Sequence, residues 1–319
     1  MEISNSKAKT FQNCKMQYTY KYIRNLQAKT KSRPLYFGSW MHELLETHFK
    51  GEDWTKTHKR LCKEYNKLFD VEKDEIGDLP TECYNKMRSY AYNYREEDGD
   101  LEVIATELEL EVKMPHNHTM TLKIDMLTVD DLGLWIWEHK NHKQLPNAMD
   151  RFMDIQSARY AWAVSRLPQF KQYGPPVGIV WDYIISKPPT KPKLVDKGTR
   201  LSKSKINTDL WTFVSAIKEY DLRLRDYRDD ILRLKQRNDF FERIRVPVTT
   251  QISKILVRDL IYTADEIERG VKPVRNIGRH CSWCDYQKLC VTELYGGDIT
   301  RLLKAEYEPR QKKGGGSGN

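Results

Sequence analysis

The sequence lacks the features that would assign it to membrane proteins, secreted proteins or ATP-driven motors. No apolar run reaches the roughly 20 residues that a membrane-spanning helix needs. The first residues, MEISNSKAKTF, contain no apolar signal-peptide core. No GxxxxGK[ST] phosphate loop occurs, so we expect no use of ATP by this chain. These absences predict a cytoplasmic protein without a membrane partner.

Cysteine is scarce, and acidic residues are outnumbered by basic ones. The six cysteines among 319 residues would stay reduced in the cytoplasm, so we expect free thiols or metal ligands before disulfides. Lys and Arg number 54 against 45 Asp and Glu, and the resulting net charge of +9 suits a polyanionic partner. Residues 314–319, which read GGGSGN, resemble a linker scar and are left out of the fold prediction.

The centre of the chain predicts a hairpin that carries charged side chains. Residues 119–129 alternate apolar and polar, which is typical of a half-buried strand, and LWIWEHK at 134–140 is a second strand after a turn. Asp125 lies on the first strand, and Glu138 and Lys140 are two apart on the second, so the latter two share a face. Carboxylates bind hard divalent cations, and an ammonium can orient water or stabilise a phosphate. Such a trio is also common on solvated strand surfaces.

Other segments predict an α/β fold with a mixed sheet flanked by helices. Residues 37–49 form an amphipathic helix with His42 one turn in, and residues 149–165 form another with Gln156 and Tyr160 four apart. The remaining expected elements are helices at 54–69 and 79–97, a strand with three glutamates on one face at 101–114, a doubly buried strand at 177–185, and a mostly helical stretch at 208–245.

The last third of the chain contains a cysteine motif. Cys281, Cys284 and Cys290 form C-x2-C-x5-C, a spacing that points several thiolates at one metal group. One ligand is missing from this set, and Cys14 is the natural candidate. Structural zinc and an iron–sulfur cluster both fit the spacing. Cys62 and Cys83 have no ligand-like spacing and are interpreted as ordinary thiols.

These motifs together resemble the RecB-like branch of the PD-(D/E)XK nuclease superfamily. That branch shows G-x3-H on a first helix, Asp on a strand, D/E-x-K on the next strand, and Q-x3-Y on the following helix. Here they occur in order as Gly38 to His42, Asp125, Glu138 to Lys140, and Gln156 to Tyr160. A subgroup, which includes CRISPR-adaptation-associated, AddB-type and phage exonucleases, adds one N-terminal cysteine and a C-terminal C-x2-C-x5-C. One departure is Glu138, where the branch commonly has Asp.

The resemblance implies a restriction-endonuclease-like core, and it implies roles for the motif residues. His42, Asp125 and Glu138 would bind Mg²⁺ or Mn²⁺, with the histidine favouring manganese. Lys140 would help position the attacking water, and Gln156 and Tyr160 would line the path of the DNA. The four motif cysteines would hold a 4Fe-4S cluster that ties the two ends of the chain together; they are Cys14, Cys281, Cys284 and Cys290.

The resemblance also predicts the activity and the division of the chain. We expect a DNA exonuclease acting on single-stranded DNA or duplex ends in a bacterial or phage-infected cell, with recombination or CRISPR-adaptation proteins as possible partners. The alternatives are a structure-specific endonuclease, a non-catalytic iron–sulfur subunit that binds nucleic acid, and a zinc-stabilised interaction protein. The expected segments are an N-terminal helix with Cys14 (1–35), a helical region with His42 (36–100), a nuclease core (101–186), a basic loop that holds substrate (187–207), a second helical region (208–270), a cluster segment (271–295) and a tail (296–319).

Overall fold

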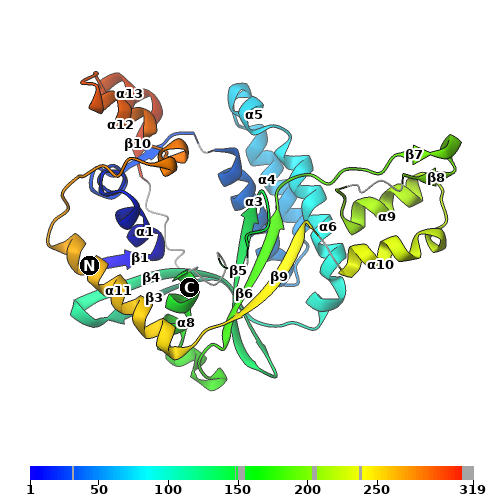
Figure 1. Ribbon diagram of the computed structural model, residues 1–319, viewed down its shortest axis with the longest axis horizontal. Coiled ribbons are helices and arrows are strands. Elements are labelled where there is room, and N and C mark those ends of the chain that lie inside the picture. The colour runs from blue at the N-terminus through cyan, green and yellow to red at the C-terminus, as the bar shows by residue number, and fades with distance from the viewer. Residues whose placement is uncertain (31, 148, 150–154, 203–206, 237–238, 311–319) are drawn as a thin grey trace. The chain divides into compact units, whose positions relative to one another are not determined.

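The computed structural model describes residues 1–30, 32–147, 149, 155–202, 207–236 and 239–310 of the chain (Figure 1). The chain divides into two compact units. The core unit comprises Ser32–Leu110 and Lys123–Leu256, and the terminal unit comprises Met1–Lys31, Glu111–Leu122 and Val257–Asn319. None of the helices within the described ranges combines the length and the apolar character that crossing a membrane requires.

A mixed sheet forms the centre of the core unit, as the sequence predicts. Its strands are β3 (Glu102–Met114), β4 (His118–Asp130), β5 (Gly133–His142), β6 (Gly178–Ile185) and β9 (Phe241–Pro247). β3 pairs with β4, β4 runs antiparallel to β5, β5 runs parallel to β6, and β6 runs antiparallel to β9 (Figure 1). Every residue of β6 is buried, which confirms the prediction of a strand covered on both faces.

The predicted hairpin is present, and its turn is made by the residues that the sequence indicates. Asp130 pairs with Gly133 at the end of the β4–β5 ladder. The Oδ1 atom of Asp130 accepts a hydrogen bond from the Leu132 N–H at 2.9 Å, as in an Asx turn. Gly133 has a φ of 127°, a conformation that side chains disfavour. The turn therefore holds the register that brings β4 and β5 together.

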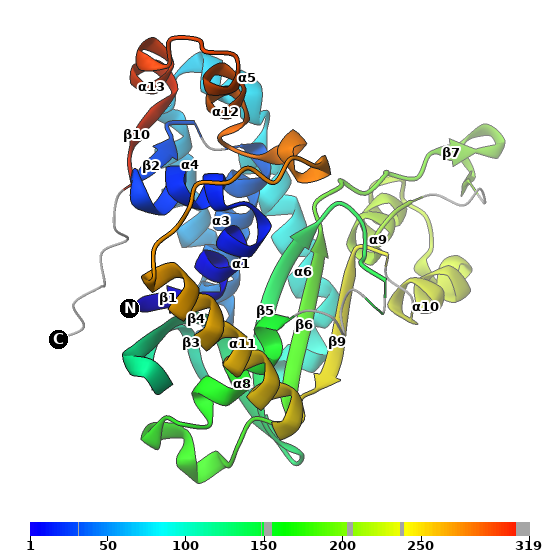
Figure 2. The same cartoon turned by 60° about the vertical axis from the view of Figure 1, so that its left-hand side comes forward.

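Helices cover both faces of this sheet (Figure 2). α3 (Arg33–Phe49), α4 (Trp54–Asn66), α5 (Asp70–Ile76) and α6 (Leu79–Gly99) enclose an apolar core with the side chains of Trp135 and Trp137 from β5. α8 (Ile155–Val164) packs on β5 and β6. Because side chains alternate along a strand, Glu138 and Lys140 point away from the Trp137 face. The predicted helix 149–165 begins partly outside the described residues.

A smaller lobe of the core unit contains β7 (Leu194–Val195), β8 (Arg200–Leu201), α9 (Leu210–Glu219) and α10 (Arg228–Gln236). Leu201, Phe213 and Ile217 form its apolar centre. The prediction of a helical region over 208–270 was wrong for residues 241–247, which form β9. The sequence did not indicate this strand, because Arg243 is charged yet buried in it. Its guanidinium stacks on Tyr94, with 3.6 Å between Cζ and the ring centroid.

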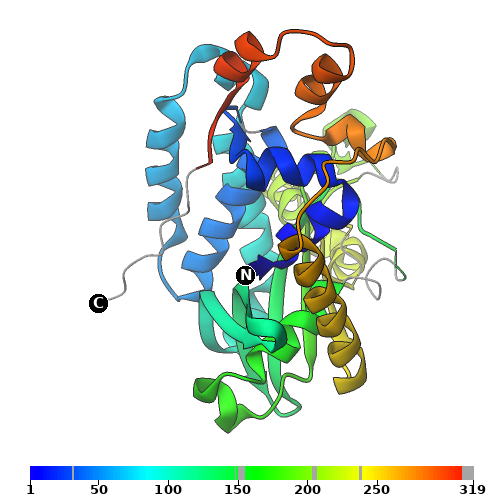
Figure 3. The ribbon, with the colours of Figure 1, turned by 90° about the vertical axis from the view of Figure 1, so that its left-hand side faces the viewer.

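The terminal unit combines the first and last segments of the chain (Figure 3). Its elements are β1 (Glu2–Ser4), α1 (Asn5–Asn13), α2 (Lys15–Tyr18), a π-helical turn (Thr19–Ile23), β2 (Leu26–Ala28), α11 (Thr250–Glu268, in this unit from Val257), α12 (Gln287–Leu294), α13 (Thr300–Glu306) and β10 (Tyr307–Pro309). β1 runs parallel to residues 119–121 of β4, and β10 runs antiparallel to β2. Gln12 donates a hydrogen bond to Thr263 at 2.9 Å, which joins α1 to α11.

Candidate metal centre

The β4–β5 ladder ends where the predicted catalytic residues begin. Its last backbone pair is Met126 with Trp137, so Asp125 and Glu138 are the next residues on the two strands. The N–H of His139 donates a hydrogen bond of 2.7 Å to the Oδ2 atom of Asp125. A main-chain donor therefore holds this carboxylate in place, and its second oxygen is left to face other ligands.

Three potential metal ligands converge beside this point. The ligand atoms of His42, Glu107 and Asp125 all lie within 4.8 Å of one another. Nδ1 of His42 lies 3.5 Å from Oδ1 of Asp125 and 3.8 Å from Oε1 of Glu107. His42 comes from α3, Glu107 from β3 and Asp125 from β4, so tertiary packing assembles the group. One nitrogen and several carboxylate oxygens form a donor set suited to Mn²⁺ or Mg²⁺.

Glu107 was not predicted as a ligand, although the sequence places it on a glutamate-rich strand. Its side chain is only 13% exposed, whereas Glu109 and Glu111 are exposed. Glu107 also has a φ of 50°, a left-handed conformation that costs a non-glycine residue on the order of 1 kcal/mol. The ammonium of Lys123 forms an ion pair with the Oε2 atom of Glu107. Backbone strain of this kind concentrates at functional sites. No pattern in the sequence predicts the left-handed conformation of Glu107.

Glu138 and Lys140 lie together on one face of β5, as the sequence predicts. The ammonium of Lys140 forms an ion pair with Oε1 of Glu138. The side chain of Gln156 on α8 also hydrogen-bonds to Glu138. Among the described residues, no group hydrogen-bonds to Oε2 of Glu138, although this atom is buried. A buried carboxylate oxygen without a donor is costly unless a cation or water completes it.

The pKa values reflect this crowding of charges. Burial raises the pKa of Glu138, and the charge of Asp125 raises it further against the opposing effect of Lys140. Burial disfavours the charged form of His42, yet a hydrogen bond with Glu107 and the charge of Asp125 raise its pKa. Burial also opposes ionisation of Glu107, but its contacts with His42 and Lys123 lower its pKa. A divalent cation would relieve the repulsion among the carboxylates.

A buried polar network supports the site from the opposite face of β5. Nδ1 of His139 lies 2.7 Å from Oδ2 of Asp182, which also accepts a hydrogen bond of 2.5 Å from the Tyr90 hydroxyl. Arg243 lies 3.5 Å from Oδ1 of Asp182. Burial favours the neutral acid, but the charge of Arg243 and the hydrogen bond with His139 lower the pKa of Asp182. His139 is thereby anchored at both its ring and its main chain, between Glu138 and Lys140.

The residues present fit a divalent cation. His42, Glu107 and Asp125 supply clustered donors, and Glu138 supplies a buried oxygen without a partner among the described residues. Tyr160 is buried on α8, one turn beyond Gln156, and the side chain of Gln156 hydrogen-bonds to Glu138. The structure therefore brings His42, Asp125, Glu138, Lys140 and Gln156 into one region.

The predicted cysteine ligands lie in the terminal unit. Cys14, Cys284 and Cys290 pack against one cluster of apolar side chains that includes Tyr20 and Tyr286. Burial raises the pKa of the Cys284 thiol, and the nearby Cys14 and Cys281 raise it further. Arg275 Nε donates to Cys290 Sγ at 3.3 Å. The fold brings Cys14 close to the C-terminal motif, and all six cysteines are free thiols.

The mixed sheet carries an Asp and an E-x-K pair at adjacent strand ends, and a donor set that suits a divalent cation lies beside them. This arrangement is typical of a site for metal-dependent phosphodiester hydrolysis. A family model of the PD-(D/E)XK nuclease superfamily matches residues 2–291 of the chain. The chain therefore belongs to the PD-(D/E)XK nuclease superfamily, whose members are metal-dependent nucleases that act on nucleic acid. No curated protein matches the sequence.

Proposed function

We propose that the protein is a deoxyribonuclease that uses Mg²⁺ or Mn²⁺ and degrades DNA as an exonuclease. The observation that carries this proposal is the convergence of His42, Glu107 and Asp125 next to the Glu138–Lys140 pair. Phosphodiester hydrolysis requires neutralisation of the anionic transition state and an activated water, and a bound divalent metal supplies both. The net charge of +9 supports a polyanionic substrate.

In this proposal each side chain has a distinct task. Asp125 and Glu138 hold the cation, with His42 and Glu107 completing the donor set. Lys140 orients the attacking water and stabilises negative charge on the phosphate. Its ion pair with Glu138 keeps the ammonium next to the metal ligands. The His139 N–H donates to Oδ2 of Asp125 and so fixes the orientation of this carboxylate, whose Oδ1 faces His42.

We further propose that Cys14, Cys281, Cys284 and Cys290 hold a 4Fe-4S cluster. The proximity of Cys14 to the C-terminal motif supports this ligand set over a group of unrelated thiols. Iron–sulfur clusters are held by thiolates, and a hydrogen bond from Arg275 to the Cys290 sulfur would stabilise the anionic form. In this role the cluster closes the terminal unit and takes no part in hydrolysis.

Digestion of end-labelled linear DNA and covalently closed circular DNA, with Mg²⁺, Mn²⁺ or EDTA, tests the proposal. An exonuclease shortens the linear molecules in the presence of metal and leaves the closed circles intact. Cleavage of the circles would assign an endonuclease instead. Binding of both DNAs without any cleavage would assign the non-catalytic subunit and contradict the proposal.

A further inference from the structure

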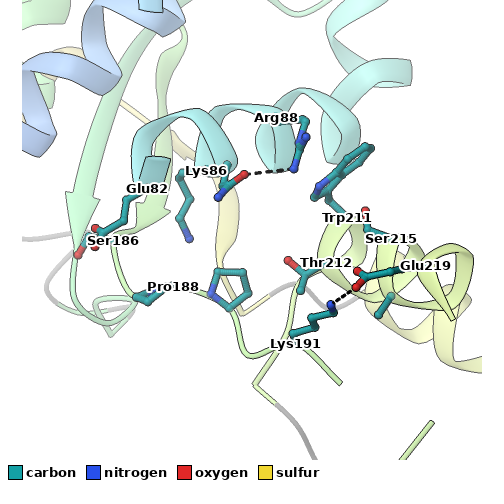
Figure 4. A pocket seen from close by; sticks show the side chains of 13 residues that line it. Glu82, Lys86, Arg88, Ser186, Pro188, Lys191, Trp211, Thr212, Ser215 and Glu219 are labelled. Atoms are coloured by element: carbon teal, nitrogen blue, oxygen red, sulfur yellow. Dashed lines mark hydrogen bonds and ion pairs between the residues drawn. The ribbon is translucent and has the colours of Figure 1, made fainter. Parts of the chain in front are cut away.

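A cavity in the core unit lies apart from the residues of the metal centre. It has a volume of about 270 Å³ and lies between α6, the segment after β6 and α9 (Figure 4). Sites for small ligands measure roughly 300–1,000 Å³, so the cavity lies just below this range and suits no more than one nucleotide. None of its lining residues belongs to the nuclease motifs.

The lining combines one large aromatic side chain with basic and hydroxyl groups. Trp211 stands at the start of α9, and the hydroxyls of Thr212 and Ser215 follow it along the same helix. The guanidinium of Arg88 stacks on the Trp211 ring with 4.5 Å between its Cζ atom and the ring centroid. Lys191 lines the cavity from the opposite segment. Aromatic faces, cations and hydroxyls are the groups that contact the bases and phosphates of single strands.

Two of the basic groups in the cavity form no direct ion pair among the described residues, although the charges of Asp209 and Glu82 act on Lys86. Lys86 is only 3% exposed and donates a 3.0 Å hydrogen bond to the carbonyl of Lys187. Nε of Arg88 is buried and has no hydrogen-bond partner among the described residues. In the part of the chain that the structure describes, neither residue forms an ion pair, whereas Lys191 is paired with Glu219 at 2.6 Å. A buried cation without a counter-ion is costly, and an anionic ligand would offset that cost.

A second hollow lies next to the Trp211 cavity along the chain. Lys187 lines a second hollow of about 520 Å³, whereas its neighbours Ser186 and Pro188 line the Trp211 cavity. Lys143, which follows β5 and its catalytic Lys140, lines that second hollow. The two hollows thus share the segment 186–188, which directly follows β6.

We propose that the Trp211 cavity binds one nucleotide of a single-stranded nucleic acid, with the base against Trp211 and its phosphate at Lys86, Arg88 and Lys191. This inference rests on the proposed nuclease function and adds to it a binding site for the strand away from the metal. Such a site would hold the strand between successive cleavages. It also assigns a task to the segment after β6, where the sequence predicts a substrate-holding basic loop.

Binding of a fluorescein-labelled oligothymidine, measured by anisotropy in EDTA, tests this site without cleavage. Trp211→Leu removes the aromatic face but keeps apolar volume, and Trp211→Phe keeps a smaller aromatic face. Stacking on an aromatic ring contributes roughly 1–3 kcal/mol per base. We therefore expect Trp211→Leu to weaken binding roughly 5- to 100-fold and Trp211→Phe to weaken it several-fold less. Equal binding by Trp211→Leu and the unaltered chain would overturn the proposal.

A charge variant provides a test that is independent of how well the Trp211 variants fold. Lys191→Ala should lower the slope of log K against log salt by about 0.7, because one phosphate contact is lost. Lys218→Ala is the matched control, since Lys218 is exposed on α9 and does not line the cavity. Identical slopes for the two variants would contradict the proposed site.

Metal-dependent cleavage by the unaltered chain separates this inference from the proposed function. If the chain cleaves DNA but Trp211→Leu binds as the unaltered chain does, only the nucleotide site is wrong. If the chain binds DNA through Trp211 but never cleaves with Mg²⁺ or Mn²⁺, only the nuclease proposal is wrong.

Discussion

The carboxylate cluster of the core unit and the cysteine cluster of the terminal unit are assembled in different ways. Asp125 and Glu138 are brought together by the register of one hairpin, and helices α3 and α8 add single side chains to it. The cysteine cluster instead joins Cys14 to residues that are more than 260 positions away in the sequence.

This difference predicts how far each unit would depend on its proposed metal group for folding. The core unit buries aromatic and aliphatic side chains from four helices and four strands, so its carboxylates lie on a scaffold with its own apolar core. The cluster around the cysteines contains only Met16, Tyr20, Tyr286, Leu289 and Tyr307 as buried residues. A small apolar cluster contributes little, so metal ligation should matter more for the terminal unit.

The largest expected effect is the loss of a cluster cysteine. Cys14→Ser, Cys281→Ser, Cys284→Ser or Cys290→Ser should abolish visible absorption of the purified protein and lower its thermal stability. Metal ligation at small sites contributes on the order of 10 kcal/mol to apparent folding energy. Absorption spectra and thermal unfolding measure the two effects. Cys62→Ser and Cys83→Ser are the controls, and loss of colour in Cys62→Ser with retention in Cys14→Ser would contradict the ligand set.

Loss of a catalytic carboxylate should abolish cleavage without this loss of colour. Asp125→Asn and Glu138→Gln keep the shape of the side chain but remove the charge that holds the cation. We expect cleavage to fall at least about 10³-fold, which corresponds to roughly 4 kcal/mol of transition-state stabilisation. Initial rates on labelled linear DNA with Mn²⁺ measure it. Undiminished cleavage by either variant would contradict the assignment of Asp125 and Glu138 to the catalytic site.

The buried lysine of the nucleotide cavity should make the stability of the core unit depend on pH. Burial lowers the pKa of Lys86 to about 8 in the folded chain, against 10.5 for an ordinary lysine. The folded chain therefore binds fewer protons than the unfolded chain between these two values, so stability rises with pH there. Relative to Lys86→Met, the unaltered chain should gain up to about 3 kcal/mol between pH 8 and 10.5.

Denaturant unfolding of both proteins across this range measures the gain. The Lys86→Met chain is the reference, because every other titrating group is common to the two proteins. A difference in stability that stays constant from pH 8 to 10.5 would show that Lys86 titrates as an ordinary lysine.

The smallest effect concerns the ligand that the sequence did not reveal. Glu107→Gln should weaken Mn²⁺ binding roughly 10-fold, or about 1.4 kcal/mol, because one anionic donor is lost while two other carboxylates and His42 remain. Calorimetric titration with Mn²⁺ measures this change without DNA. Glu109→Gln, an exposed change two residues away on the same strand, should bind as the unaltered chain does. Equal affinities for the two variants would exclude Glu107 from the donor set.

Much of the core unit follows from local patterns in the sequence. The alternation in 119–129 and the aromatic strand at 134–140 predict the hairpin, and the polar turn between them predicts its register. That register places Asp125 and Glu138 at adjacent positions on paired strands. The spacing of Glu138 and Lys140 then puts both side chains on one face, because the strand period is two residues.

Tertiary structure alone decided the features whose signals are not local. The sequence does not predict β9, because this strand buries the charged side chain of Arg243. That burial depends on Tyr94, Asp98 and Asp182, which lie on other elements. Glu107 joins the candidate donor set through contacts that no local pattern predicts, since its backbone is left-handed and His42 approaches it from α3.

The sequence by itself determined the motif residues, their order, and the strand faces that carry them, because these depend on periods of two and about four residues. Packing decided which distant groups meet those residues, such as Cys14 with the C-terminal cysteines and Gln156 with Glu138. Such contacts depend on how whole elements bury their apolar faces against one another. A linear pattern contains no record of that geometry.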